Sequence, residues 1–135
     1  MNKKITLALL TFTLITAILT GCGNSSKLAD VFDKDTVEEQ AISDITLAES
    51  NDFEGWVSRF APEFQSALTE EIYAAYMDTL NQYGTFKEFG QCAIIGQEQN
   101  GKNYAVVIII CKHENGDIKY TLAFDEQMNL IQMTI

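Results

Sequence analysis

The sequence is poor in proline, histidine and basic residues. One proline and eight glycines in 135 residues exclude collagen-like and low-complexity classes. A single histidine excludes any mechanism that needs a histidine pair. Nine basic residues stand against 19 acidic ones, and the net charge of −10 would repel nucleic acid, so no nucleic-acid partner is expected. The rest of the composition, 47% hydrophobic and 21% charged, is that of one small globular domain.

The N-terminus has the pattern of a cleaved leader. Two lysines lie within residues 1–4, and residues 5–19 are apolar apart from threonines. This apolar run is shorter than the ~20 residues that span a bilayer, and small residues follow it. The pattern predicts a signal peptide over residues 1–21.

Leu19-Thr20-Gly21-Cys22 resembles the lipobox of bacterial lipoproteins. The resemblance implies that the Cys22 thiol carries a diacylglycerol, that the mature chain begins at Cys22, and that lipid anchors it at the extracytoplasmic face of the cell membrane. Two acyl chains hold a protein at a bilayer where one does not. An ordinary secretory signal or an uncleaved anchor is the alternative. No other cofactor is expected.

Cleavage would divide the chain into a short tether and one domain. Residues 22–34 are predicted to be the lipidated cysteine and tether, because the stretch after Cys22 is small and polar. Residues 35–135 are predicted to be a single α+β domain. Loss of Lys3 and Lys4 changes the net charge from −10 to −12, which we interpret as simple solubility at the cell surface.

Two or three helices are predicted in the first half of this domain. A helix from about Asp35 has Thr36 and Glu39 at capping-box spacing. A second begins near Asn51 and is stopped or bent by Pro62. A third runs from an N-cap at Thr69 to Gly84. The apolar residues that recur at helical spacing are Val37, Ala41, Ile42, Ile45, Ala48, Phe53, Trp56, Val57, Phe60, Ile72, Tyr73, Tyr76, Met77, Leu80 and Tyr83.

Four strands are predicted in the second half. They cover residues 89–97, 104–113, 118–124 and 130–135, with turn signals at Asn100-Gly101 and Asn115-Gly116. Consecutive hairpins make a curved antiparallel meander with the helices on one face, so the expected fold class is α+β.

The hairpin loops predict which side chains share the inner face. A two-residue Asn115-Gly116 loop places Cys111 opposite Tyr120, and a four-residue last loop places Met133 opposite Leu122. A slip of one residue would move every apolar side chain to the wrong face. The predicted inner face holds Val107, Ile109, Ile118, Tyr120, Leu122, Phe124, Ile131 and Met133.

This order of elements resembles the nuclear-transport-factor-2-like, or cystatin-like, cone. Residues 83–86 (Tyr-Gly-Thr-Phe), 103–107 (Asn-Tyr-Ala-Val-Val) and 120–125 (Tyr-Thr-Leu-Ala-Phe-Asp) are similar to a family of bacterial lipoproteins, mainly Gram-positive, catalogued as a domain of unknown function. The resemblance covers residues 30–135 and brings no catalytic motif. The cone hosts enzymes, ligand pockets and interaction modules alike. Its usual first strand would correspond to residues 60–68, unless these are irregular.

No residue is predicted to be catalytic or to bind a metal. His113 is the only imidazole, and no aspartate lies at a spacing that would place it beside His113 on a strand. Cys92, Cys111 and His113 share the predicted inner face but lack a fourth ligand for zinc.

Cys92 and Cys111 are a possible disulfide. A four-residue loop at residues 100–103 would oppose them directly, and an extracytoplasmic compartment favours the bond. A two-residue turn would leave them diagonal, about 7–8 Å apart. Two reduced, buried thiols are the alternative.

Four aromatic residues could line the mouth of a cone: Trp56, Tyr73, Tyr76 and Tyr120, with Tyr83 nearby. Such a pocket would be mostly apolar with a few hydroxyl groups. Aromatic residues at helical spacing are more often part of a core.

The opposite face of the sheet is also apolar. Ile95, Val106, Ile108 and Ile110 point outward in the predicted register, whereas a solvated antiparallel face is normally polar. A second copy of the chain or another surface protein would cover this face. The alternative is a small, tolerated patch of good strand formers.

The expected function is therefore a membrane-anchored, non-enzymatic binding or interaction module. The alternative is a small enzyme that uses a carboxylate or a tyrosine in the cone. A purely structural envelope domain is a third possibility.

Overall fold

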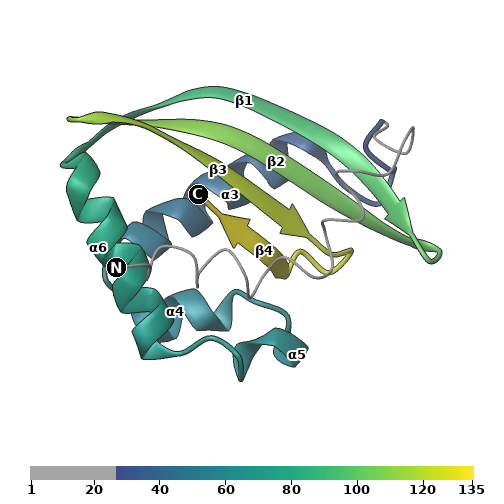
Figure 1. The fold of residues 1–135 in the computed structure, drawn as a ribbon. Coiled ribbons are helices and arrows are strands. Elements are labelled where there is room, and N and C mark those ends of the chain that lie inside the picture. The colour runs from purple at the N-terminus through teal and green to yellow at the C-terminus, as the bar shows by residue number, and fades with distance from the viewer. Residues whose placement is uncertain (1–26) are drawn as a thin grey trace.

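The computed structural model describes residues 27–135, so the predictions for Cys22 and the leader lie outside the described residues. Within residues 27–135, four helical segments precede four strands (Figure 1). The helices are α3 (Lys34–Glu49), α4 (Phe53–Ser58), α5 (Pro62–Gln65) and α6 (Glu70–Tyr83). The strands are β1 (Phe86–Gln99), β2 (Lys102–His113), β3 (Gly116–Phe124) and β4 (Leu130–Thr134). The predicted α+β class is confirmed.

The strands form one antiparallel sheet in the order β1-β2-β3-β4. Figure 1 shows the long strands β1 and β2 arching over α3, with α6 beside the end where β1 starts. The short helices α4 and α5 lie on the side of β4. The long helices α3 and α6 therefore pack on one face of the sheet, as predicted.

Side-chain caps set the helix starts. Asp33, and not Thr36, caps α3, because its Oδ1 accepts the Thr36 backbone N–H at 2.8 Å. These hydrogen bonds lower the pKa of the exposed Asp33 carboxyl. The Thr69 cap of α6 is confirmed: its hydroxyl oxygen accepts the Ile72 N–H at 3.2 Å. Gly84 ends α6 with φ 77°, a conformation that glycine adopts without strain.

The segment after α4 is not a strand of the sheet. Phe60 forms a single parallel bridge with Leu130, with the Leu130 N–H donating to the Arg59 carbonyl at 2.8 Å. The Ala61 N–H donates to the Leu130 carbonyl at 2.8 Å. Pro62 then starts α5 instead of stopping the second helix, which ends at Ser58. Proline suits a first helical position because its missing N–H would have no partner there.

The first hairpin has the two-residue turn. Asn100 and Gly101 both have positive φ, 54° and 77°, as the tight hairpin turn requires. Cys92 faces Ile109 in this register, and an irregularity between Phe89 and Cys92 places Phe89 opposite Cys111.

The second hairpin turns one residue earlier than predicted. Its loop is Glu114-Asn115, so Tyr120 faces Ile109 and not Cys111. The Glu114 and Asn115 N–H groups donate to the Thr85 and Tyr83 carbonyls at 2.9 and 2.8 Å, which ties the turn to the end of α6. The pairing moves by two residues, so the sorting of side chains between the faces survives.

The last hairpin contains a bulge. Met133 faces Leu122 as predicted, but Phe124 faces Leu130 because the register shifts after Ala123. The predicted inner position of Ile131 is therefore wrong. Leu130 joins the main core, and Ile131 packs on the outer face in a second cluster.

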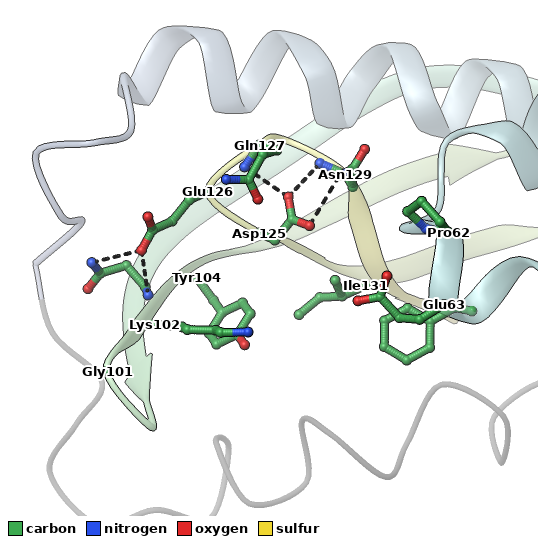
Figure 2. Close-up of a pocket in the computed structure, with 12 residues that line it drawn as sticks. Pro62, Glu63, Gly101, Lys102, Tyr104, Asp125, Glu126, Gln127, Asn129 and Ile131 are labelled. Carbon is green, nitrogen blue, oxygen red and sulfur yellow. Dashed lines mark hydrogen bonds between the residues drawn. The ribbon is translucent and has the colours of Figure 1, made fainter.

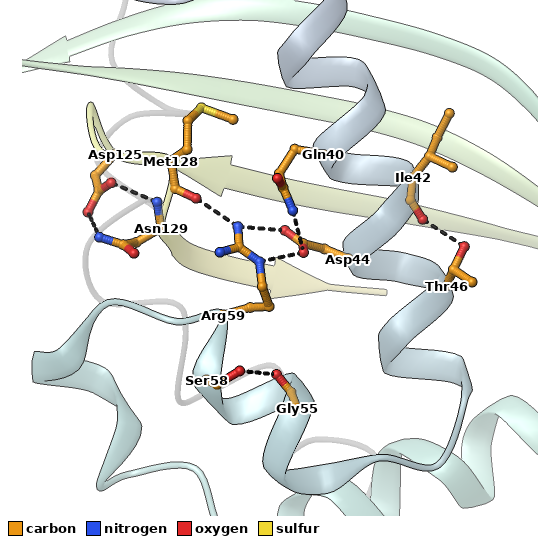
Figure 3. A network of polar contacts seen from close by, with 10 residues as sticks. All are labelled: Gln40, Ile42, Asp44, Thr46, Gly55, Ser58, Arg59, Asp125, Met128 and Asn129. Carbon is orange, nitrogen blue, oxygen red and sulfur yellow. Dashed lines mark hydrogen bonds and ion pairs between the residues drawn. The ribbon is translucent and has the colours of Figure 1, made fainter.

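A buried ion pair joins three parts of the chain (Figure 3). Arg59 Nε and Nη2 donate to the two carboxylate oxygens of Asp44 on α3, at 2.6 and 3.1 Å. Arg59 Nη2 also donates to the Met128 carbonyl at 2.7 Å, in the loop between β3 and β4. Gln40 Nε2 donates to Asp44 at 2.9 Å. Both oxygens of the Asp44 carboxylate therefore accept hydrogen bonds, and the ion pair links α3 to the segment that follows α4.

Candidate functional site

A cavity of about 340 Å³ opens where α3, α6 and β1 meet. We call it the α3–α6 cavity. Its walls are mainly apolar, and its polar groups come from four side chains: Thr46, Glu49, Asn81 and Thr85. The apolar lining residues are Ile45, Met77, Leu80, Gly84, Phe86 and Phe89. A volume of this size is at the lower end of the range for small-molecule sites.

Glu49 is the charged residue of this wall. Its side chain is 14% exposed, and it lies at the C-terminal end of α3, one turn after Ile45. Buried polar groups contact both of its oxygens. Tyr120 Oη donates to Oε2 at 2.8 Å, and His113 Nε2 lies 3.0 Å from Oε1.

A second tyrosine extends this chain of hydrogen bonds into the core. Tyr120 donates its proton to Glu49, so its oxygen accepts from the Tyr76 hydroxyl at 2.5 Å. Burial raises the pKa of both phenols far above the usual range, and the neighbouring Glu49 carboxylate adds to the rise. Both tyrosines therefore act as neutral donors, Tyr76 to Tyr120 and Tyr120 to Glu49.

His113 completes the cluster from β2. Its Nδ1 lies 3.2 Å from the Cys111 carbonyl oxygen, which can only accept, so Nδ1 carries a proton. The contact between Nε2 and Glu49 needs one more proton, which either partner holds. The rings of Tyr83 and Phe86 pack against the imidazole in T-shaped arrangements, at centroid distances of 6.5 and 5.6 Å. His113 is 1% exposed, so Glu49 alone connects this pair to the cavity.

The four predicted pocket aromatics are buried. Trp56, Tyr73, Tyr76 and Tyr120 are at most 4% exposed, and none lines the α3–α6 cavity. Trp56 packs on Tyr73 at 5.0 Å between centroids, and the Tyr73 hydroxyl donates to the Ala48 carbonyl. These four residues therefore belong to the hydrophobic core and do not line the mouth of a cone. Tyr76 and Tyr120 reach the cavity only through Glu49.

Sequence reasoning missed Glu49 and gave His113 no role. Glu49 is 64 residues from His113 and 71 from Tyr120, so no local spacing connects them. One signal was available: Glu49 lies four residues after Ile45, which places its carboxylate on the apolar face of the helix.

Cys92 and Cys111 are free thiols in the structure. The two-residue turn leaves them diagonal, so the direct opposition that a disulfide needs is absent. Both belong to the inner face, where burial raises the pKa of Cys92 and raises that of Cys111 to about 12. Neither is therefore a reactive thiolate near neutral pH. In residues 27–135, no group of three or more histidine, cysteine or acidic side chains could hold a metal ion.

The predicted interface residues divide into two groups. Val106 is fully buried on the outer face in a cluster with Ala61, Tyr104, Ala123 and Ile131, against which Ile95 and Phe64 pack. Ile108 and Ile110 are half-buried. The apolar face is thus partly covered by the segment around α5, and an interface there stays a prediction.

A larger cavity of about 520 Å³ lies near the β1–β2 turn and the loop after β3 (Figure 2). Its two loop carboxylates already have partners. Asp125 accepts the Gln127 and Asn129 N–H groups at 3.0 and 2.9 Å, and Glu126 accepts the Asn103 N–H at 3.0 Å. These bonds shape the loop, so we assign them a structural role.

A family model described as "Protein of unknown function (DUF3887)" matches residues 42–133. The chain belongs to this family. It is also similar to a protein from Ruminococcus gnavus ATCC 29149 whose structure was solved by NMR, with 48% identity and a TM-score of 0.75. That match covers 82% of this chain and 97% of the other. Both Asp44 and Glu49 lie inside the family match. No curated protein matches the chain. Among the helices of residues 27–135, none has the length and apolar character to span a membrane.

Proposed function

We propose that the protein is a lipid-anchored, extracytoplasmic binding module that takes a small ligand into the α3–α6 cavity. The anchor rests on the leader pattern and the lipobox-like residues that end at Cys22. The bent sheet with helices on one face supports a nuclear-transport-factor-2-like cone as its fold (Figure 1). The domain would act at the outer surface of the cell membrane.

Glu49 carries the proposal for the ligand. Removing a carboxylate from water costs free energy even when polar groups contact both of its oxygens. The position of Glu49 in the cavity wall therefore favours a functional role. Glu49 lines this mainly apolar cavity, and each of its carboxylate oxygens can accept a further hydrogen bond. The ligand would therefore have an apolar body and one hydrogen-bond donor, with an ammonium group favoured over a hydroxyl and a carboxylate rejected.

Binding fits this wall better than catalysis. Thr46 donates its hydroxyl to the Ile42 carbonyl at 2.8 Å, so it is not a free nucleophile. Asn81 and Thr85 carry no titratable group. The enzymatic alternative rests on the Tyr76–Tyr120–Glu49 chain, in which Glu49 would act as a base on a bound substrate.

The ligand test uses the full chain in lipid nanodiscs, observed by ligand NMR against empty nanodiscs. Three probes share one ring: benzylammonium, benzyl alcohol and phenylacetate. We expect the strongest binding for benzylammonium and none for phenylacetate. Glu49→Gln should abolish the preference for the cation, whereas Glu39→Gln, an exposed carboxylate of the same helix, should retain it. Equal binding of all three probes, unchanged in Glu49→Gln, would contradict the proposal.

The anchor has its own test. Cys22→Ala should lose incorporation of labelled palmitate and leave the processed membrane fraction, while Cys92→Ala should behave like the parent. A Cys22→Ala protein that is cleaved normally and still labelled would show that the anchor is elsewhere.

A further inference from the structure

The structure separates the end of the domain where the tether enters from the end that holds the cavity. Lys27 and Leu28 cross β1 at Gly96, where a methyl group would collide with the Lys27 carbonyl oxygen. Leu28 packs against the main core, which fixes this segment on the domain. Gly96 lies four residues before the β1–β2 turn.

Two elements place the cavity at the opposite end. Helix α3 runs from the tether end to Glu49, about 23 Å at 1.5 Å per residue. Strand β1 runs the other way, from Phe86 and Phe89 at the cavity to Gly96, and the seven residues from Phe89 to Gly96 span about 23 Å. The two estimates agree, so Glu49 and the cavity lie about 20 Å from the point where the tether meets the domain.

The chain between the proposed lipid and the domain is short. Four residues lie between Cys22 and Lys27, and the five Cα–Cα steps span at most about 18 Å. The tether end of the domain therefore stays close to the bilayer surface. After cleavage the chain carries a charge of −12, so electrostatic attraction to an anionic leaflet would not draw the rest of the domain onto the membrane.

We infer that the domain stands on the bilayer with its β1–β2 turn toward the lipid headgroups and the α3–α6 cavity directed away from them. The inference rests on the proposed lipid anchor. Its consequence is that the ligand reaches Glu49 from the aqueous side and not from the membrane. Phe86, 39% exposed at the cavity rim, would then face the extracellular medium.

Two labels on one strand test this orientation. Lys87 and Glu98 are both exposed and lie near the two ends of β1, about 36 Å apart along the strand. Lys87→Cys and Glu98→Cys, each in a Cys92→Ser background, receive the same fluorophore, since Cys111 is fully buried. The full chain, lipidated in a bacterial host, is reconstituted into vesicles that carry a nitroxide at the headgroup.

We expect quenching to be several-fold stronger at Glu98→Cys than at Lys87→Cys. Equal quenching at both positions, or stronger quenching at Lys87→Cys, in protein that floats with the vesicles would overturn the orientation and leave the anchor intact. Protein that does not float with the vesicles would instead overturn the anchor, and this inference with it.

Discussion

Helix α3 carries two inward carboxylates, five residues apart, in very different surroundings. Asp44 is 1% exposed and forms a two-point ion pair with Arg59, whose charge is permanent. Glu49 is 14% exposed and is held by a neutral phenol and an imidazole. The Asp44 carboxylate is buried and paired with Arg59, whereas Glu49 has buried partners for both oxygens and also lines a cavity.

This difference shows why burial alone does not identify a site. Burial raises the pKa of Asp44, and the hydrogen bonds and charge of Arg59 oppose the rise. Because each charge has the other as its partner, we assign the pair a structural role. Glu49 has no permanent countercharge among its partners, and its open side lines a cavity. A carboxylate with donors on one side and empty space on the other is suited to receive a ligand.

Removal of Arg59 should have the largest effect. Arg59→Leu leaves the buried Asp44 carboxylate without its partner, which should cost about 3–5 kcal/mol in the free energy of unfolding at pH 7. The folded-state pKa of Asp44 should then rise further above its unfolded value. The deficit is therefore complete above the folded pKa and shrinks as the pH falls toward about 4. Urea unfolding at pH 7 and pH 4.5 measures both effects.

The double variant Asp44→Leu/Arg59→Leu is the matched control. An apolar pair of similar volume should recover most of the lost stability and remove the pH dependence. If the double variant is as unstable as Arg59→Leu, packing of the arginine stem, and not the unpaired charge, explains the loss.

Removal of the Tyr120 hydroxyl should have an intermediate effect. Tyr120→Phe leaves the Tyr76 hydroxyl without its acceptor and takes one donor from Glu49, at a cost of about 1–3 kcal/mol. Tyr76→Phe keeps the bond from Tyr120 to Glu49 and should cost about 0.5–1.5 kcal/mol. Thermal unfolding at pH 7 compares the two. A greater loss in Tyr76→Phe would mean that the order of donors is wrong.

The outer face should contribute least to stability. Ile108→Lys touches neither carboxylate and replaces a half-buried side chain, so the free energy of unfolding should change by no more than about 0.5 kcal/mol. If the outer face joins two copies, sedimentation of the full chain in detergent should show a dimer for the parent and a monomer for the variant. Monomers in both cases, with all partners retained, would reject the interface.

Local signals predicted most of the secondary structure. Thr69 and Gly84 bound α6 because a side-chain cap and a left-handed glycine act on backbone groups within one turn. Errors occurred where two local solutions competed. Asp33 took the cap predicted for Thr36, since both offer an oxygen at a suitable spacing, and the Asn115-Gly116 signal lost to a turn tied to the end of α6.

The candidate site was predictable only in part. Tyr76 and Tyr120 were singled out as aromatic residues that could line the mouth of a cone, and both belong to the hydrogen-bond chain that ends at Glu49. Glu49 itself was not, because a single glutamate at a helix end is common and carries no chemical signature. Ile131 was misplaced for a similar reason: one extra residue in β4 reverses the face, and no residue type marks the bulge.

The sequence by itself determined the α+β class, the strand order and, except at the bulge beside Ile131, the division of side chains between two faces, because periodicity and short turns act between near neighbours. Only the tertiary structure decided which polar groups meet. Asp44 and Arg59, and likewise Glu49, His113 and Tyr120, come together across 15 to 71 residues. Such contacts depend on how the helices pack against the curved sheet. An unpaired polar group costs free energy when it is buried, so packing arrangements that pair these groups are favoured.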